Sequence, residues 1–507
     1  MESELRSYCR RETLSEEGLR EIIQRHGLTP NNHHRLGNYG FFLSACINER
    51  VTEGIIRCLL EYFPDAANVC DDTGWSPLHF ACGNENVTLN IIQLIIAAAP
   101  TSLRSTTNSG NMPLHILCLV EKVNEVHVVQ ILKLLIDKYP EAVRHADNDV
   151  GILPIHNASG RRSPEFCRVL IEAYPGSEQI TTTNGKLPLH WACAYNSPAT
   201  VEYLYRIFPD AIHASTLEEY PVHVAISSME HRNKPAVAVK VVQCLLDCDP
   251  NQMLKQFQGN SLLHFACGKR YGHSNIEAGI QMIKVLFDAH PEAIEDNRIA
   301  TNIHRYHYRV QEFLNNQLFF ARQAKDHRLM TTPDNNGHLP LHRALQNNVR
   351  LGSIKLLVKG NPVALQSADN SGALPLHVAC QHHDSVNEIQ YLVELDQSTL
   401  EAMDGEGNTA LHLACRRGRH DIISLLLDEF DAVSVSKRNA DEKLPIDLLW
   451  ESTEVDDRES IEYTESVYRL LRANPEMIMG CDVHTMQYSA SDSPPPCQSG
   501  KKRKLGQ

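Results

Sequence analysis

The sequence contains no apolar run long enough to cross a membrane or to direct secretion. Its longest apolar stretch, residues 90–100, is interrupted by Gln93 and is far shorter than the roughly 20 residues of a spanning helix. Residues 1–6 lack the apolar core of a signal peptide. We therefore expect a soluble intracellular protein, in the cytoplasm, the nucleus or both, without a membrane partner.

Positive charge is also scarce. The 507 residues include 48 Lys and Arg against 62 Asp and Glu, which gives a formal net charge of −14. This balance argues against a general affinity for nucleic acid or for an anionic membrane.

Motifs that carry chemistry are missing as well. The sequence has no Gly-x-x-x-x-Gly-Lys phosphate loop, no Gly-x-Ser-x-Gly nucleophile elbow and no His-Glu-x-x-His zinc pair. We expect neither enzymatic activity nor a cofactor.

What the sequence does contain is one short motif, Pro-Leu-His-x-Ala-Cys, repeated along most of its length. Successive motif histidines are 33 to 41 residues apart, except for a gap of 78 residues between His264 and His342. A fixed period of this kind predicts an array of structural repeats, which is more often a binding surface than an active site. The copies occupy residues 77–82, 113–118, 154–158, 188–193, 221–225, 262–267, 340–344, 375–380 and 410–415, with worn copies at 43–46 and 445–447.

Each repeat has the punctuation of a turn followed by two helices. Asp, Asn and Gly precede the motif, as in 71–74 and 369–372, where a tight turn needs them. The motif proline suits the first turn of a short helix. A second helix follows with apolar residues at helical spacing, such as Ile91, Leu94 and Ile95, and a proline such as Pro100 comes after it.

This pattern resembles the ankyrin repeat, and in particular the expanded ankyrin families of some unicellular eukaryotes. The resemblance covers residues 38–479, with Cys in place of the second Ala and Tyr-Pro-Glu-Ala in place of the usual Gly-Ala. It implies an all-α solenoid of about 10 to 12 units with short hairpin-like turns, in which the motif His links its own helix to the next unit. We expect a capping helix after a flexible start in 1–37, and a disordered basic tail in 480–507.

The recurrent His and Cys of the motif could be taken for a catalytic pair or a zinc site. Because they are copied in many units, we interpret them as scaffold residues instead. Equivalent cysteines in stacked helices lie too far apart for disulfides, so we expect them to be buried free thiols. Cys244 and Cys248, with His264 further on, offer no fourth zinc ligand, and we assign them to an apolar helix stripe.

An irregular segment, residues 296–333, fills the long gap between His264 and His342. Its apolar spacing predicts a long helix in place of the usual first helix of the unit. Two interpretations remain open for this segment, a lengthened repeat and a distinct docking feature. The helical face consists of Phe313, Leu314, Gln317, Leu318 and Ala321.

The resemblance implies that a protein partner binds the concave face, lined by the turn tips and the positions after each first helix. The anchors carried over to this sequence are Trp75, Lys186, Tyr195, His338, His382, Arg416 and Arg417, with Asp72, Thr73, Gly83, Asn84, Ala194, Gln346, Asn347 and Gln381 beside them. Arg416 and Arg417 indicate an acidic partner segment.

We accordingly expect a monomeric, non-catalytic scaffold or adaptor. Two alternatives stay open: a nuclear regulator that masks a transcription factor, and the targeting subunit of a ubiquitin ligase or phosphatase. The basic residues Lys501, Lys502, Arg503 and Lys504 resemble a short nuclear import signal, although a solubilising charged end has the same composition.

Overall fold

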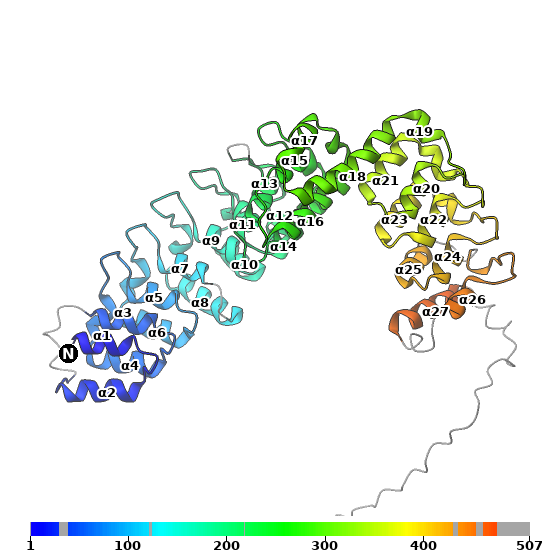
Figure 1. The fold of residues 1–507 in the computed structure, drawn as a ribbon. Coiled ribbons are helices and arrows are strands. Elements are labelled where there is room, and N and C mark those ends of the chain that lie inside the picture. The colour runs from blue at the N-terminus through cyan, green and yellow to red at the C-terminus, as the bar shows by residue number, and fades with distance from the viewer. Residues whose placement is uncertain are drawn as a thin grey trace, which may run out of the picture. The chain divides into compact units, whose positions relative to one another are not determined.

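The computed structural model describes residues 2–29, 39–120, 124–216, 219–428, 434–452 and 460–473. Within these residues the regular structure is helical, and the only bridge pairs are the isolated ones of Thr216 with Glu219 and Phe257 with Asn260. The chain divides into two compact units, Met1–Leu318 and Phe319–Gln507 (Figure 1). The all-helical repeat fold predicted from the sequence is confirmed.

The first unit is a stack of helix pairs. We call the first helix of a pair, which carries the motif, the inner helix, and the second the outer helix. The pairs are α1 (Glu2–Cys9) and α2 (Glu16–Arg25), α3 (Gly40–Ile47) and α4 (Glu53–Tyr62), α5 (Pro77–Cys82) and α6 (Leu89–Ala98), α7 (Pro113–Leu119) and α8 (Glu125–Lys138), α9 (Pro154–Arg161) and α10 (Pro164–Ala173), α11 (Pro188–Tyr195) and α12 (Pro198–Ile207), α13 (Pro221–Ser228) and α14 (Ala236–Cys248), and α15 (Leu262–Cys267) and α16 (Ile276–Ala289). After these come α17 (Asn297–Asn302) and α18 (Tyr308–Lys325), the helix that contains the boundary between the units.

The second unit repeats the arrangement. Its elements are α19 (His327–Thr331), then the pairs α20 (Pro340–Gln346) and α21 (Leu351–Gly360), α22 (Pro375–His382) and α23 (Val386–Leu395), α24 (Ala410–Arg416) and α25 (His420–Asp428), and α26 (Pro445–Ser452) and α27 (Ile461–Ala473). Short 3₁₀ helices follow most outer helices in both units: η1 (Pro64–Asn68), η2 (Pro100–Arg104), η3 (Pro140–Arg144), η4 (Ser177–Gln179), η5 (Pro209–His213), η6 (Pro250–Leu254), η7 (Pro291–Glu295), η9 (Pro362–Gln366), η10 (Gln397–Leu400) and η11 (Ser434–Ser436); η8 (Ile303–Arg305) follows α17.

Local sequence explains where these helices begin and end. The motif proline is the first residue of most inner helices, where its missing N–H is no loss. The outer helices α2, α4, α6, α8 and α10 begin after side-chain caps, as when the hydroxyl of Thr88 accepts the N–H of Ile91. The proline after the outer helix opens a 3₁₀ turn, because its ring cannot continue the α-helix.

The core lies between the two helix layers and runs along each stack. Inner helices pack on inner helices and outer helices on outer helices, as α7 does on α5 and α9, and α12 on α10 and α14. The recurrent cysteine fills a small site in this core. All seven motif cysteines are buried free thiols, as predicted: Cys46, Cys82, Cys118, Cys193, Cys267, Cys380 and Cys415. Burial raises the pKa of the Cys380 thiol to about 12, so it stays protonated and inert.

The motif histidine forms the first hydrogen-bond ladder between repeats. Its Nδ1 accepts the backbone N–H three residues before it, as His115 does from Met112 at 3.1 Å. The proton therefore sits on Nε2, which donates to a carbonyl of the next turn. The acceptors are Asn111 for His79 (2.9 Å), Ile152 for His115 (3.1 Å), Ile180 for His156 (3.1 Å), Ala402 for His377 (3.1 Å) and Lys443 for His412 (3.2 Å).

The ladder has exceptions that follow the chemistry of the side chain. Asp447 replaces the histidine in the last repeat, and its carboxylate accepts the N–H of Leu444 at 2.8 Å. A carboxylate has no N–H to donate onward, so the replacement occurs where no further motif follows. Among the described residues, Nε2 of His190, His223 and His342 makes no hydrogen bond, and neither does Nδ1 of His264.

Many turn tips form a second ladder, in which a backbone N–H of one tip donates to a carbonyl of the tip before it. Asn108 donates to Thr73 at 2.9 Å, and Gly405 donates to Ser371 at 2.8 Å. The turns need glycine at a left-handed position, such as Gly372 at φ +78°. They project to one side of the stack in the first unit (Figure 1).

Gly405→Ala tests this second ladder. A Cβ at residue 405 would lie 2.4 Å from the backbone oxygen of Ser371, so the two turns would have to separate. We expect the free energy of unfolding of the second unit to fall by about 1–3 kcal/mol, measured by urea denaturation with circular dichroism. Gly268→Ala is the control, because its Cβ would meet no atom closer than 3.5 Å. Equal losses in both variants would contradict the ladder.

The irregular segment corrects one detail of the prediction. The long helix exists as α18, and Val310, Leu314, Gln317 and Ala321 are its buried face. However, α17 packs on the inner helix α15, whereas α18 contacts the outer helix α16 through Phe313 on Phe287 and Arg309 on Glu277. The prediction that the long helix replaces the first helix of its unit is therefore wrong, since it takes the second position.

The amino-terminal end also differs from the prediction. In place of a flexible start, residues 2–9 form α1, which packs on α3, while α2 packs on α4. The reason is that Leu5 and Cys9, one turn apart, are both buried. At the other end α27 packs on α25. Residues 480–507, with the predicted import signal, lie outside the described residues.

Candidate partner-binding surface

The predicted site residues fall at two places in the repeat. Lys186 and His338 lie in or beside turn tips, and Trp75 follows the turn that precedes α5. Tyr195, His382 and Arg416 are each the last residue of an inner helix. The structure thus places them along the inner helices, but it divides them into side chains that face outward and side chains that hold the stack.

A third ladder of hydrogen bonds explains that division. Side chains just after an inner helix donate to carbonyls at the end of the preceding inner helix, which would otherwise lack partners. Asn84 donates to the carbonyls of Cys46 and Asn48, both at 2.9 Å. Asn84 is 5 % exposed, so most of its side chain serves the stack even though it lies among the residues that line the open face. The same role falls to Arg162, Asn196 and Arg232.

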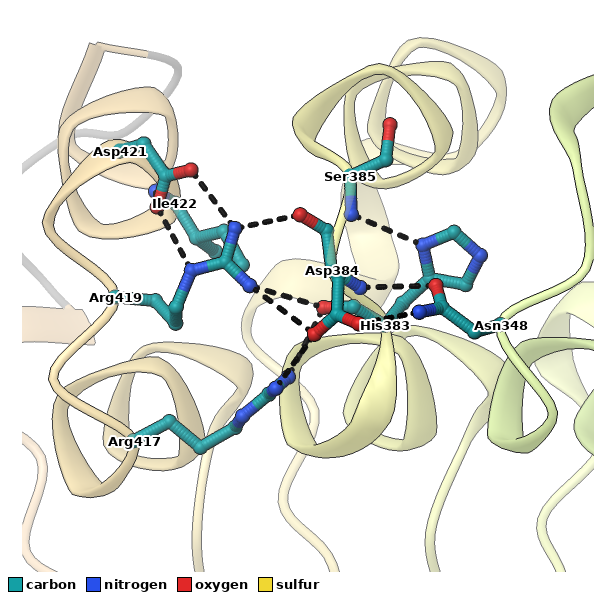
Figure 2. A network of polar contacts seen from close by, with 8 residues as sticks. All are labelled: Asn348, His383, Asp384, Ser385, Arg417, Arg419, Asp421 and Ile422. Atoms are coloured by element: carbon teal, nitrogen blue, oxygen red, sulfur yellow. Dashed lines mark hydrogen bonds and ion pairs between the residues drawn. The ribbon is translucent and has the colours of Figure 1, made fainter.

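Arg417 belongs to this ladder too. Its Nη1 donates to the backbone oxygen of His383 at 2.9 Å, and its Nη2 reaches the Asp384 carboxylate at 2.9 Å. Asp384 also binds the Asn348 amide and lies 3.6 Å from Arg419, so one carboxylate joins three repeats (Figure 2). Arg419 in turn forms an ion pair with Asp421 at 2.8 Å.

His338 and Arg416 are also paired within the chain. The His338 ring lies 3.3 Å from Asp369 and 3.7 Å from Asp334, and stacks on His342. Arg416 lies 3.6 Å from Glu406. His382 is exposed, and partial burial together with Arg417 lowers the pKa of its ring. Arg416 and Arg417, which indicated an acidic partner segment, are thus already paired with Glu406 and Asp384 of the chain itself.

Trp75 opens onto an apolar groove in the first unit. Its ring packs on Phe80 at a centroid distance of 5.1 Å, and both side chains are half-buried. Ile47 and Leu119 are 53 % and 39 % exposed on the rims. Ile116 lines the floor beside Gly83, whose missing side chain keeps the groove open. The groove has a volume of about 530 Å³ and spans α3, α5 and α7.

Tyr195 is 56 % exposed and lines a second hollow, four repeats beyond α3. The other lining residues are mainly polar and basic, and include Arg161, His231, Arg232 and Lys234. Ile47, Phe80 and Leu119 of the groove, and these basic residues, are absent from the sequence-based anchors. A signal was available for some of them, because Leu119 occupies the same repeat position as Gly83, four residues after the motif histidine.

Other kinds of site find no support in the part of the chain that the structure describes. No three His, Cys, Asp or Glu side chains there are grouped so that they could hold a metal ion. Cys244 and Cys248 lie beside the buried stripe of Val241 and Leu245 on α14. None of the described helices has the length and hydropathy to traverse a lipid bilayer.

Stacked helix pairs, ladders at the turns and an exposed inner-helix surface define a helical-repeat protein of the interaction class. One stretch in each unit matches the family model described as "Ankyrin repeats (3 copies)", namely residues 119–215 and 349–439. The chain is an ankyrin-repeat protein. The ankyrin repeat is generally a non-catalytic protein-interaction module.

Curated relatives share only part of the chain. A stretch of 117 residues is 29 % identical to inversin of Canis lupus familiaris and to inversin of Homo sapiens. The matched stretch is 22 % of this chain and 10 % of either inversin. The match thus spans about a tenth of the length of these relatives.

Proposed function

We propose that this protein is a non-catalytic scaffold or adaptor that holds a segment of a partner protein along the inner helices of its first unit. The observation that carries the proposal is the groove at Trp75. Ile47 and Leu119 leave much of their apolar surface in water on either side of the half-buried Trp75 and Phe80. Exposed apolar side chains beside a half-buried Trp are typical of protein interfaces.

The groove fits an apolar side chain of an extended or helical segment. Phe80, Ile116 and Trp75 provide an apolar floor, and Glu85 is its one charged lining residue among those described. If a partner covered Ile47 and Leu119, the complex would gain the free energy of burying about two large apolar side chains. Lys186, beside a turn tip of the first unit, is a secondary position in this proposal, and His382 and Arg416 are the corresponding candidates on the inner helices α22 and α24 of the second unit.

The test replaces the rims without disturbing the fold. We expect Ile47→Glu with Leu119→Glu to reduce capture of the partner from cell extract at least about ten-fold, because charges would enter an apolar contact. Quantitative mass spectrometry of material captured on the full-length chain measures the change, and cross-linking locates the contact.

The matched control carries the same charges elsewhere. Val126→Glu with Leu254→Glu changes two side chains that are at least as exposed, on α8 and η6, away from the groove. This variant should capture the partner like the unchanged chain. If the groove variant and the control retain the same proteins in the same amounts, the groove is not the binding site.

A further inference from the structure

A basic pocket lies at the ends of the inner helices α9 and α11, beside the loop that leads into α14. It is lined by Arg161, Tyr195, His231, Arg232 and Lys234, and has a volume of about 460 Å³, within the range of small-ligand sites. Arg161, His231 and Lys234 are exposed. The chain as a whole has a net charge of −14, whereas the described residues that line this pocket include basic side chains and no Asp or Glu.

The charge of Arg232 has no carboxylate partner. Its guanidinium donates to the backbone oxygens of Cys193 and Asn196, both at 2.8 Å, and to the Ser228 hydroxyl at 2.9 Å. All three acceptors are neutral, and no Asp or Glu is among the described residues that line the pocket. The contrast is with Arg417 and Arg419, whose charges meet Asp384 and Asp421. Arg232 therefore brings to the pocket a positive charge that none of the described lining residues offsets.

We propose that this pocket binds a phosphorylated side chain of the partner segment. A phosphomonoester brings nearly two negative charges and three acceptor oxygens. Arginine and lysine side chains supply the donors that such a group prefers. A single carboxylate would leave part of this positive charge unmatched, so the number of basic groups favours the phosphate. The ring of Tyr195 offers a wall for the peptide on either side of the phosphorylated residue.

The proposal rests on the proposed function, because the same segment would occupy the apolar groove. Tyr195 and Asn84 both follow their motif histidine by five residues, so the pocket and the groove lie at equivalent heights of the repeat. The inner helices α7 and α11 are separated by one other inner helix, α9. Helices pack about 8–10 Å apart, so an extended segment would span the interval of roughly 20 Å with about six residues.

A degenerate peptide library tests the pocket directly. The full-length chain is immobilised and incubated with peptides that carry one fixed phosphoserine among random residues, or the same peptides with serine or glutamate fixed instead. We expect retention of the phosphoserine library to exceed that of the serine library at least about ten-fold, as for a charge-assisted hydrogen-bonded contact. Retention of the glutamate library should fall between the two.

The variant Arg161→Glu with Lys234→Glu should lose this preference for phosphoserine. Arg232 is left unchanged, because it holds the stack. The control, Lys133→Glu with Lys240→Glu, makes the same change of charge on the exposed outer-helix residues of α8 and α14 and should retain the preference. Circular dichroism shows whether both variants remain folded. Equal retention of the phosphoserine and serine libraries, or equal loss in both variants, would overturn the proposal.

The groove variant separates this proposal from the proposed function. If Ile47→Glu with Leu119→Glu loses the partner while the chain shows no preference for phosphoserine, the groove binds a partner and the basic pocket does not recognise phosphate. If the preference is present and depends on Arg161 and Lys234 while the groove variant captures normally, the phosphate pocket stands and the groove proposal fails.

Discussion

Lowering the pH from 7 to 5 is expected to destabilise the first unit, Met1–Leu318. Burial lowers the pKa of five of its motif histidines from about 6.5 to about 4, namely His79, His115, His156, His190 and His223. Between these values the unfolded chain binds protons that the folded chain does not. The free energy of unfolding therefore falls as the pH falls from about 6.5 to about 4.

The geometry of the first ladder explains the low pKa. Nδ1 of His156 faces the N–H of Leu153 at 3.1 Å, so a second proton on the ring would meet a donor instead of an acceptor. The ring is also inaccessible to water. At pH 5 the linkage amounts to about 2 kcal/mol for each histidine. Since a repeat array unfolds in parts, even a fraction of the combined effect should be visible.

Urea denaturation at several pH values, followed by circular dichroism, measures the effect. His156→Gln should flatten the pH dependence, because the amide can accept and donate like the neutral ring but does not titrate. His127→Gln is the control, since His127 is exposed on α8. Although burial opposes it, hydrogen bonds from Thr73 and Trp75 hold the pKa of Asp71 below its usual 3.8, so that carboxylate matters only at lower pH. A urea midpoint that is constant from pH 7 to pH 5 would refute the prediction.

Repeat spacing predicts most of this fold because each punctuating residue has a local physical role. The motif proline begins a helix, the turn glycine accepts a left-handed backbone, and the motif cysteine fills a small buried site. The positions of α17 and α18 could not be predicted in the same way. The apolar face of α18 indicates burial, but the sequence does not specify whether inner or outer helices provide the neighbour. That choice depends on the short helix α17, which has only Ile299 buried.

The candidate site was harder to predict, because residue type does not distinguish an anchor from a structural cap. Trp75 is half-buried and Tyr195 is exposed, so both stay predicted anchors. Arg417 is also of a residue type that often anchors an interface, but its guanidinium donates hydrogen bonds to His383 and Asp384 within the stack. Whether a side chain turns outward or back onto the previous helix depends on how that helix ends.

Adjacent arginines at the end of α9 illustrate this distinction and provide the second large effect. Arg162 is 2 % exposed, and its guanidinium donates to the backbone oxygen of Leu117 at 2.6 Å and lies over the Phe166 ring. Glu125 lies 3.7 Å away, and burial lowers the pKa of the guanidinium. Arg161, one residue earlier, is exposed and lines the basic pocket.

We expect Arg162→Ala to lower the free energy of unfolding of the first unit by about 2–3 kcal/mol. The substitution removes a charge-assisted hydrogen bond, leaves the Leu117 oxygen without that donor and deletes the packing of the arginine stem on Phe166. The relief of burying a cation offsets part of this loss, which is why we expect less than for a severed buried ion pair. Arg161→Ala should change stability by less than about 0.5 kcal/mol.

The order of the two variants should reverse when binding is measured instead of stability, with the larger loss now in Arg161→Ala. Arg161→Ala should weaken retention of the phosphoserine library, because it removes a donor from the pocket, whereas folded Arg162→Ala should retain the preference for phosphoserine. Urea denaturation and library binding on the same preparations measure both properties. Loss of stability in Arg161→Ala equal to that in Arg162→Ala would mean that both arginines hold the stack. Such a result would remove Arg161 from the proposed recognition site.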